Sequence, residues 1–437
     1  MLVCQRYSGN HLGGYSGVYG IQENPASFVN KTPKWDVNLF GTGLWAYTEY
    51  GYIADQSALS VTSRTILDAT DSIPSEYNSE SNALFYANQF DDALNGLMFQ
   101  QTIHLPSFCF KVNNMSFGLF TNAKFAIDAI DAPNFFNYQN LKELIDFQPY
   151  TINPFSVNGM AWGEIGLHFG YAHTLDNDNI LSVGINPKYL LGFEAGYIQN
   201  KTDYNFYRDR DTFFASEANL SIGFASGAST TSNSYDFGVQ GTGLGLDIGA
   251  EYIIPHDIES ESKSPHYMKF GLAIRDLGSI TFNNNTQQHD FAINNVDFSV
   301  LNTITDNTDH NYDMLERLSA AIYNGDSSRS LSSREMTFYT PTSLTGYWDY
   351  NITKDVFVNL YATRRLKTLE RQIAAPNVFM VSGRFEKRWF EAGASVSLTE
   401  DKWLGIGTYV RLGLLTIGSD HINAISRLVK DYKPRQF

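Results

Sequence analysis

A strict alternation between apolar and small or acidic residues runs through Gly241–Tyr252, GTGLGLDIGAEY. Residues two apart in a strand point to the same side, so Leu244 and Ile248 share an apolar face while Asp247 and Glu251 lie opposite. The pattern predicts a β-strand, and two environments fit it. In a soluble sandwich the apolar face is the core, whereas in an outer-membrane barrel it meets lipid and the polar face lines the lumen.

The same alternation recurs along the chain. Phe117–Phe125, Ile165–Tyr171 and Met268–Ile274 repeat it in the same sense, and pairs such as Asn113-Asn114 supply tight turns between strands. The count is about fourteen strands, and an even number is typical of single-chain bacterial barrels. Predicted strands lie at 34–47, 50–61, 98–112, 115–127, 160–175, 180–195, 213–225, 241–254, 267–282, 337–352, 356–366, 377–389, 391–399 and 403–417.

Composition narrows the class of protein. The formal net charge of -15 argues against a nucleic-acid partner, because phosphate binding requires clustered Lys and Arg. The 26 Tyr, 31 Phe and 34 Gly fit strands that twist, close and carry aromatic girdles. No apolar run of about 18 residues is present to form a membrane-spanning helix. A transmembrane, antiparallel, up-and-down β-barrel is therefore the fold that we expect.

Three segments divide the chain. Residues 1–33 are rich in Gly, Ser, Asn and Tyr and lack a sustained period. Residues 34–420 contain the predicted strands and form the barrel, and residues 421–437 form a basic C-terminal tail. Large loops are expected at 62–95, 128–158 and 283–336.

Polar residues occupy the face opposite the apolar one and are the candidate functional residues. Their mixed charges could define a polar path, but we favour ion pairs that fill and rigidify a closed barrel. His168 has no ligand partners at metal-binding spacing, so we predict a hydrogen-bonded lumen histidine and no metal site. The residues are Glu164, His168, Asp247, Glu251, Lys269, Arg275, Arg384, Glu386 and Arg411.

Two further patterns concern surfaces. The residues of Tyr312–Tyr323 have the spacing of an amphipathic helix, with Leu315, Leu318 and Ile322 on one face. This face either docks a partner or packs over the barrel mouth, and both alternatives stay open. Tryptophans lie near strand ends, where an interfacial girdle is favoured over ligand stacking. They are Trp35, Trp45, Trp162, Trp348, Trp389 and Trp403.

Catalytic signatures are absent from the sequence. There is no Gly-x-Ser-x-Gly elbow, His-Glu-x-x-His, phosphate loop or Cys/His cluster. Carboxylates and histidines from distant strands can still converge, so this absence alone does not exclude catalysis. We nevertheless predict a protein that is not an enzyme and binds no cofactor.

An ordered set of short segments resembles a known family. The chain is similar to uncharacterised outer-membrane barrels (DUF5723-like) common in Bacteroidota, related to FadL-like fatty-acid transporters and to the type 9 secretion shuttle barrel. The resemblance implies a fourteen-stranded barrel with a plug-like segment, 1–33, in or across the lumen. Asn24, Pro25 and Ala26 would help to shape this plug, although they also fit a simple turn. The matching segments are Tyr15–Val18, Asn24–Ala26, Trp35–Phe40, Ala161–Gly166, Gly241–Gly243 with Asp247, Lys269–Leu272 and Asp276–Ile280.

Two functions follow from these expectations. In the first, the barrel lies in the bacterial outer membrane, contacts its lipid, and is a structural or interaction subunit with protein partners in a larger assembly. In the second, it is a FadL-like channel that binds or takes up a hydrophobic small molecule. The predicted lumen is more charged and Gly-rich than apolar, which favours the first. A soluble β-sandwich is a third alternative, but so many long strands divide poorly into two layers.

Overall fold

The chain is almost wholly extended and antiparallel, which confirms the all-β prediction. The computed structural model describes residues 9–48, 96–131, 145–209, 212–215, 217–227, 238–256, 266–293, 296–297 and 311–420. Predictions for 62–95 and 421–437 therefore lie outside the described residues. Among the helices in the described ranges, none has the length and apolar character needed to cross a membrane.

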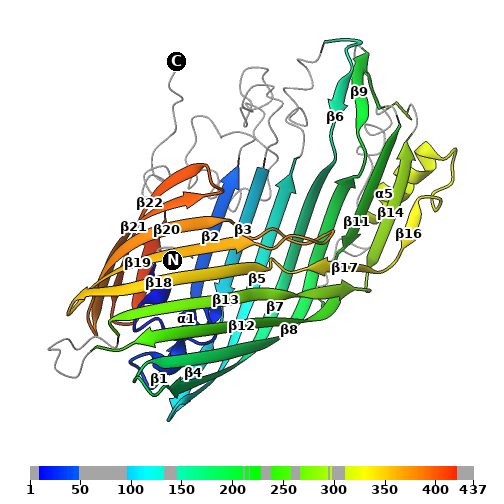
Figure 1. Cartoon of the computed structure of the whole chain (residues 1–437). Coiled ribbons are helices and arrows are strands. Elements are labelled where there is room, and N and C mark those ends of the chain that lie inside the picture. Colours follow the sequence, from blue (N-terminus) through cyan, green and yellow to red (C-terminus); the bar gives the residue numbers. More distant parts are fainter. Residues whose placement is uncertain are drawn as a thin grey trace.

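One antiparallel sheet of 19 strands contains most of the described chain (Figure 1). Its strands are β1 (Trp35–Asn38), β2 (Gly41–Thr48), β3 (Gly96–His104), β4 (Ser107–Val112), β5 (Met115–Ile130), β7 (Phe155–Thr174), β8 (Ile180–Asn200), β11 (Ala218–Ala225), β12 (Gly241–Ile254), β13 (Met268–Phe282), β14 (Thr286–Ile293), β16 (Leu331–Ser333), β17 (Met336–Tyr339), β18 (Ser343–Thr353), β19 (Val356–Arg365), β20 (Val378–Glu386), β21 (Phe390–Thr399), β22 (Trp403–Leu412) and β23 (Leu415–Ser419). A second sheet has four short strands, β6 (Tyr150–Ile152), β9 (Tyr204–Asp209), β10 (Thr212–Ala215) and β15 (Val296–Asp297).

The large sheet is strongly curved. Figure 1 shows β12, β13 and β18 crossing in front of β2, β3 and β5, with the N-terminal helices between the two groups of strands. Some long strands pair with one neighbour along their first part and with another along their last part. The first part of β8 pairs with β12 and its last part with β11, while β13 pairs first with β18 and then with β17.

The two faces of this sheet differ in the sense that the sequence predicts. Apolar side chains such as Leu244, Leu272 and Ile406 are exposed on one face. Charged and amide side chains such as Glu164, Asn186 and Asp349 are buried on the other. The same alternation of buried and exposed residues occurs in strands as far apart in the sequence as β5 and β22. Burial of charge opposite exposed apolar residues is the reverse of a soluble sheet protein.

A β-bulge interrupts the alternation in β13. Leu246 pairs with Leu277 and Ile248 with Ile274, so Arg275 and Asp276 together face one residue of β12. Asp276 adopts a left-handed backbone with φ of 52°. Both side chains consequently point to the buried face. Arg275 is among the residues predicted for the buried face, and Asp276 is not.

The N-terminal segment lies against the buried face. It contains η1 (Asn10–Leu12), α1 (Gly17–Glu23) and η2 (Phe28–Asn30). Val18, Ile21 and Phe28 form a small apolar cluster with Cys109 of β4 and Phe120 of β5. Apolar side chains thus hold the N-terminal segment against β4 and β5, and polar contacts hold it against the strands opposite.

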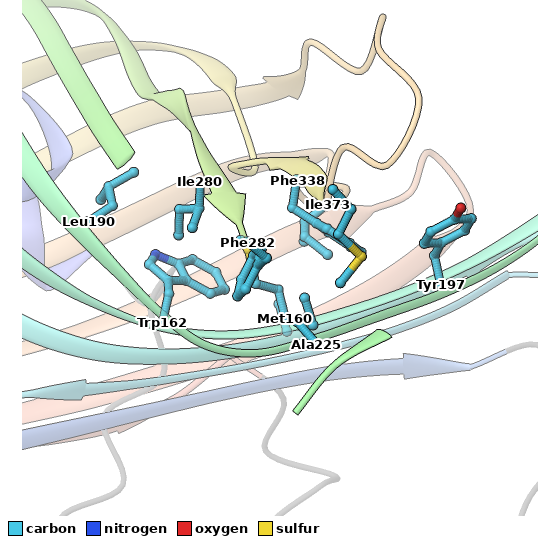
Figure 2. Close-up of a cluster of buried hydrophobic side chains, with 12 residues drawn as sticks. Met160, Trp162, Leu190, Tyr197, Ala225, Ile280, Phe282, Phe338 and Ile373 are labelled. Carbon is cyan, nitrogen blue, oxygen red and sulfur yellow. The ribbon is translucent and has the colours of Figure 1, made fainter. Parts of the chain in front are cut away.

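A larger apolar cluster fills the curved sheet farther from this segment (Figure 2). Trp162 of β7 and Leu190 of β8 meet Phe282 of β13 and Phe338 of β17 there. Ile373, between β19 and β20, is buried in the same cluster. The connection between β19 and β20 folds inward at Ile373. It is held there by a hydrogen bond from the Ile373 N–H to the Tyr339 carbonyl at 3.0 Å.

An interfacial girdle requires exposed tryptophans, and only some of the six predicted girdle residues are exposed. Trp162 is buried and donates its indole N–H to Glu164 Oε1 at 2.9 Å. Trp45 is also buried, and Trp348 is half-buried. Trp35, Trp389 and Trp403 are exposed. Trp162 is therefore a core residue, because it lies two residues before Glu164 on β7 and shares the buried face with it.

Some predicted boundaries are wrong. Residues 283–336 were expected to be a loop with one helix at Tyr312–Tyr323; the helix is α5 (Asn311–Ile322), but the strands β14, β15 and β16 were not predicted. β5 and β7 extend into the predicted 128–158 loop. The last predicted strand is a hairpin of β22 and β23, because Gly413 turns the chain with φ of 60°. β-Propensity alone does not reveal where a turn interrupts an apolar run.

Candidate functional site

The Asn24-Pro25-Ala26 step lies directly on two strands. Gly184 of β8 and Gly249 of β12 face each other in register, and a Cβ atom on either would overlap this step. The Asn24 amide donates to the Ala250 carbonyl at 3.0 Å and to the Tyr347 hydroxyl at 3.1 Å. Its Oδ1 accepts the Ala26 N–H at 2.9 Å, which forms a local turn. The predicted plug residues therefore meet the sheet where glycine permits close backbone packing.

Five charged side chains form a buried cluster beside α1. Lys124 Nζ lies 2.8 Å from Glu164 Oε1 and 3.0 Å from Asp276 Oδ1. Lys188 Nζ lies 2.7 Å from both Asp276 Oδ1 and Asp247 Oδ1. Asp276 thus bridges the two lysines, which the bulge in β13 makes possible. Its backbone N–H also donates to Asp247 Oδ1 at 2.7 Å. Opposite charges at this spacing compensate the cost of burying each one.

The N-terminal segment contributes a charge of its own. Glu23, the last residue of α1, forms a buried ion pair with Arg275 of β13. The Tyr361 hydroxyl of β19 donates to Glu23 Oε2 at 3.2 Å. Glu23 therefore joins α1 to two strands that are distant in the sequence.

A second charge cluster holds the first turn of the segment. Arg384 of β20 donates two hydrogen bonds to Asp349 of β18, at 2.6 and 2.8 Å. It also pairs with Glu386, and Glu386 Oε1 accepts the Gly14 N–H at 2.9 Å. His266 Nε2 lies 2.8 Å from Asp349 Oδ2. The two hydrogen bonds to Asp349 fix the orientation of Arg384. Glu386 accepts the Arg384 Nε–H through Oε2 and the Gly14 N–H of the segment through Oε1.

Two buried lysines hold the backbone carbonyls of η1. Lys31 Nζ donates to the Gly13 carbonyl at 2.6 Å and to the Leu12 carbonyl at 3.3 Å. Lys269 of β13 donates to the same Leu12 carbonyl at 3.0 Å. Burial, followed by the nearby positive charge of Lys269, lowers the pKa of Lys31 to about 7. Glu251, which accepts a hydrogen bond from Asn30 at 3.2 Å, partly opposes this shift.

Ser116, His168 and Asn186 form a hydrogen-bonded row on β5, β7 and β8. Ser116 Oγ lies 2.9 Å from His168 Nε2, and His168 Nδ1 lies 2.9 Å from Asn186 Oδ1. This is the order of groups in a nucleophile, base and orienting residue. All three side chains are buried, and the Asn186 amide donates to the Ile21 carbonyl at 2.8 Å. Ser116 Oγ and the Pro25 carbonyl lie against the same glycine, Gly170. The N-terminal segment therefore covers the row on the buried face.

All nine predicted polar residues are buried on this face. The structure brings Glu164 and Asp247 into the cluster beside α1, and Glu386 and Arg384 into the second cluster. Arg411 pairs with Glu391 at 3.0 Å, near Tyr15 of the segment. His168 bonds to neutral partners, as predicted for a hydrogen-bonded histidine. Their role in an interior network stays a prediction.

Several members of the two charge clusters were not among the predicted polar residues. Lys124, Lys188 and Asp349 alternate in phase with the predicted buried positions, so periodicity could have found them. Asp276 follows a bulge that the sequence does not mark. Glu23 lies in a segment without a period, and only tertiary contact places it beside Arg275.

The helix α5 packs within the fold. Leu315 is fully buried in a cluster with Phe155, Phe291 and Ile293, and Leu318 and Ile322 are partly buried against it. The structure thus uses this apolar face internally, which is the packing alternative of the two left open above.

The surroundings of α1 offer little space for a ligand. In the described ranges, His, Cys, Asp and Glu side chains do not gather in threes or more in a way that could hold a metal ion. A cavity of about 30 Å³ borders α1 between Glu23, Trp45 and His104. A cavity of this size holds about one water molecule.

Residues 25–420 match the model of a family of unknown function, DUF5723. The chain belongs to this family. None of the curated proteins compared with the chain matches it. The DUF5723 match includes every described strand, both charge clusters and Pro25, and it begins just after α1. The seat of the Asn24-Pro25-Ala26 step therefore lies inside the family region.

Proposed function

We propose that this DUF5723 protein is an outer-membrane β-barrel of about fourteen strands, closed by its own N-terminal segment, that serves as a structural and interaction subunit of a larger outer-membrane assembly. One observation carries the membrane part of this proposal. Apolar side chains cover the exposed face of the sheet, and compensated charges occupy the buried face. Lipid rather than water is the solvent that stabilises this arrangement.

Contact between the two ends of the sheet supports closure into a barrel. β2 pairs with β3 at one end of the strand order, and β22 pairs with β23 at the other. The rings of Tyr47 on β2 and Trp403 on β22 nevertheless lie 6.4 Å apart. A closed barrel would satisfy the edge N–H and C=O groups, which lipid cannot.

The short turns suggest an orientation. The turns at Asn113-Asn114, Lys354-Asp355 and Gly413-Leu414 lie at the end of the sheet near the N-terminal segment, whereas the longer connection 366–377 and the turn at Asp401-Lys402 lie at the other end. Short turns face the periplasm in outer-membrane barrels. Tyr267 and Tyr350 meet at this end, with hydroxyls 3.3 Å apart, as expected for an aromatic interface girdle.

A filled interior favours a subunit over a channel for hydrophobic molecules. The segment is held by the Glu23–Arg275 pair, by Glu386 and by Lys269, so displacing it would expose several buried charges. The cavity beside α1 has room for about one water molecule and no room for a fatty acid.

Cysteine labelling tests the membrane part. Leu244→Cys and Ile406→Cys, on the exposed apolar face, should react with a lipid-soluble maleimide and resist a charged one in vesicles. Lys201→Cys, outside the long strands on an exposed site, is the matched control that should react with the charged reagent. Rapid labelling of Leu244→Cys and Ile406→Cys by the charged reagent would contradict a lipid-facing surface.

Purification from native membranes at low detergent stringency tests the subunit part. Mass spectrometry of the product should identify a stoichiometric protein partner and no enriched free fatty acid. A monodisperse protein that carries one bound hydrophobic molecule would overturn the subunit proposal and favour the channel. Bilayer conductance is an independent readout: the intact chain should be closed, and deletion of residues 9–31 should open it.

A further inference from the structure

A hollow interrupts the exposed apolar face of the large sheet. It has a volume of about 550 Å³ and is lined by residues of β5, β7, β8, β12, β13 and β18. This volume lies within the range of roughly 300–1,000 Å³ that is usual for small-molecule sites. None of its sixteen lining residues is charged. The ligand must therefore be a hydrocarbon without polar groups at this depth.

The shape of the hollow comes from side-chain size. Ala250, on β12, pairs with Val183 of β8 on one side and with Leu272 of β13 on the other. The small Ala250 side chain among these larger apolar ones leaves a depression in the exposed face, and this depression is the groove. Apolar walls of this kind favour a chain-shaped ligand through summed dispersion contacts.

The floor of the hollow is rigid. Gly170, Gly184 and Gly249 line it, and these residues pair in register across β7, β8 and β12. On the other side, the same glycines lie against Ser116, Pro25 and Asn24. A wall that is one backbone thick is thus supported from behind by the seated N-terminal segment, and the groove cannot collapse inward.

The position of the groove identifies the class of lipid. Tyr252 lies two residues from Ala250, about 7 Å along the strand, and receives a hydrogen bond from Asn179 in a short turn. The groove therefore begins just inside the interface at the short-turn end. Under the proposed function this end faces the periplasm, where the leaflet consists of glycerophospholipid.

We propose that this groove binds one acyl chain of a glycerophospholipid from the periplasmic leaflet. The inference rests on the proposed membrane location, and it adds a specific lipid site to the general lipid contact of a barrel. Bulk lipid is as apolar as the groove, so preference arises from shape and from the rigid floor rather than from the hydrophobic effect.

A photoactivatable phosphatidylethanolamine with a diazirine on its acyl chain provides the test, in vesicles of phosphatidylethanolamine and phosphatidylglycerol. We expect cross-links to concentrate on Phe169–Tyr171 and on Ile248–Ala250. Ala250→Phe should reduce labelling there at least about fivefold, because the ring removes the space for the chain. Val183→Phe, which fills the neighbouring row, should do the same.

Ala394→Phe is the matched control, because Ala394 is exposed on the same face in β21, away from the groove. It should leave labelling of the groove unchanged. Equal labelling of the groove and of β20–β22 would overturn the acyl-chain site but leave the membrane proposal intact. Absence of labelling on both surfaces would contradict the membrane proposal itself. Preferential labelling by a lipopolysaccharide probe over the phospholipid would overturn the assignment of the lipid.

Discussion

Glu23 at the end of α1 and Arg275 on β13 form an ion pair in which both side chains are almost completely buried. They are joined across 252 positions of sequence. The bulge at Arg275 and Asp276 allows one strand to serve two clusters at once: Arg275 holds the segment, and Asp276 bridges Lys124 and Lys188. Attachment of the segment and organisation of the sheet therefore depend on the same backbone irregularity.

Removing one partner of the Glu23–Arg275 pair should weaken the protein strongly. Glu23→Gln or Arg275→Met leaves an uncompensated buried charge, which costs about 3–5 kcal/mol. Denaturant titration in detergent, followed by tryptophan fluorescence, measures the change. The double variant should recover part of the loss. As a control, Arg364→Met breaks the exposed pair with Asp401 and should change stability by about 0–1 kcal/mol. Equal effects of the buried and exposed changes would contradict this account.

Gly249→Ala should unseat the Asn24-Pro25-Ala26 step while leaving the strands intact. The added Cβ overlaps the Asn24 side chain, and overpacking of this kind costs about 1–3 kcal/mol. Hydrogen exchange of residues 18–31 should accelerate, with little change in β12. Gly383→Ala is the control, because its nearest neighbour would lie at 3.9 Å. Unchanged exchange in Gly249→Ala would mean that the contact does not hold the segment.

Seating of the N-terminal segment should weaken in mild acid through His11. Burial lowers the pKa of His11 from 6.5 to about 4, and the charge of Glu23 only partly opposes it. Between these values the released segment binds a proton that the seated segment does not, so the stability that neutral His11 contributes to seating is fully present above pH 6.5 and is lost as the pH falls to 4. The loss reaches about 3 kcal/mol.

His11→Phe provides the comparison for this pH dependence. Phenylalanine keeps the edge-on contact with Tyr361, whose ring lies 4.7 Å from that of His11, but it cannot bind a proton. Limited proteolysis of the segment between pH 7 and pH 4 should show a steeper rise in cleavage for the wild type than for His11→Phe. Parallel curves would assign the acid response to other groups.

The Ser116–His168–Asn186 row should be structural. His168→Ala would leave the Ser116 hydroxyl and the Asn186 carbonyl without their partner, at a cost of about 1–3 kcal/mol. A fluorophosphonate probe, which labels activated serines, should not label Ser116 in the intact chain or after deletion of residues 9–31. Labelling that appears on deletion and disappears in Ser116→Ala would instead identify a covered nucleophile.

Periodicity predicts much of this fold because the two faces of each strand meet different environments. β12 begins and ends where the alternation of Gly241–Ile254 does, and β5, β19 and β21 agree within a few residues. Within residues 283–336, periodicity predicts α5 but misses the short strands, because β14 is stabilised by pairing with β11 and β16 rather than by a long alternation of its own.

The buried clusters show the same division. Glu164, Asp247, Arg384 and Glu386 could be assigned to one face from strand phase alone. Which of the buried residues pair with one another could not be assigned, because phase gives the side that a residue occupies and nothing about what lies opposite. Asp276 breaks the phase, because the bulge in β13 places it and Arg275 on the same face.

The sequence by itself determined the strand-rich class, the polarity of the two faces and the distinct character of the N-terminal segment, since each is a local property of residue order. Only the tertiary structure decided that Glu23 meets Arg275, that Gly184 and Gly249 seat Asn24-Pro25-Ala26, and that Ala250 lies in a groove behind that seat. These contacts join segments far apart in the chain. They depend on register, curvature and one bulge, which emerge only when the strands pair.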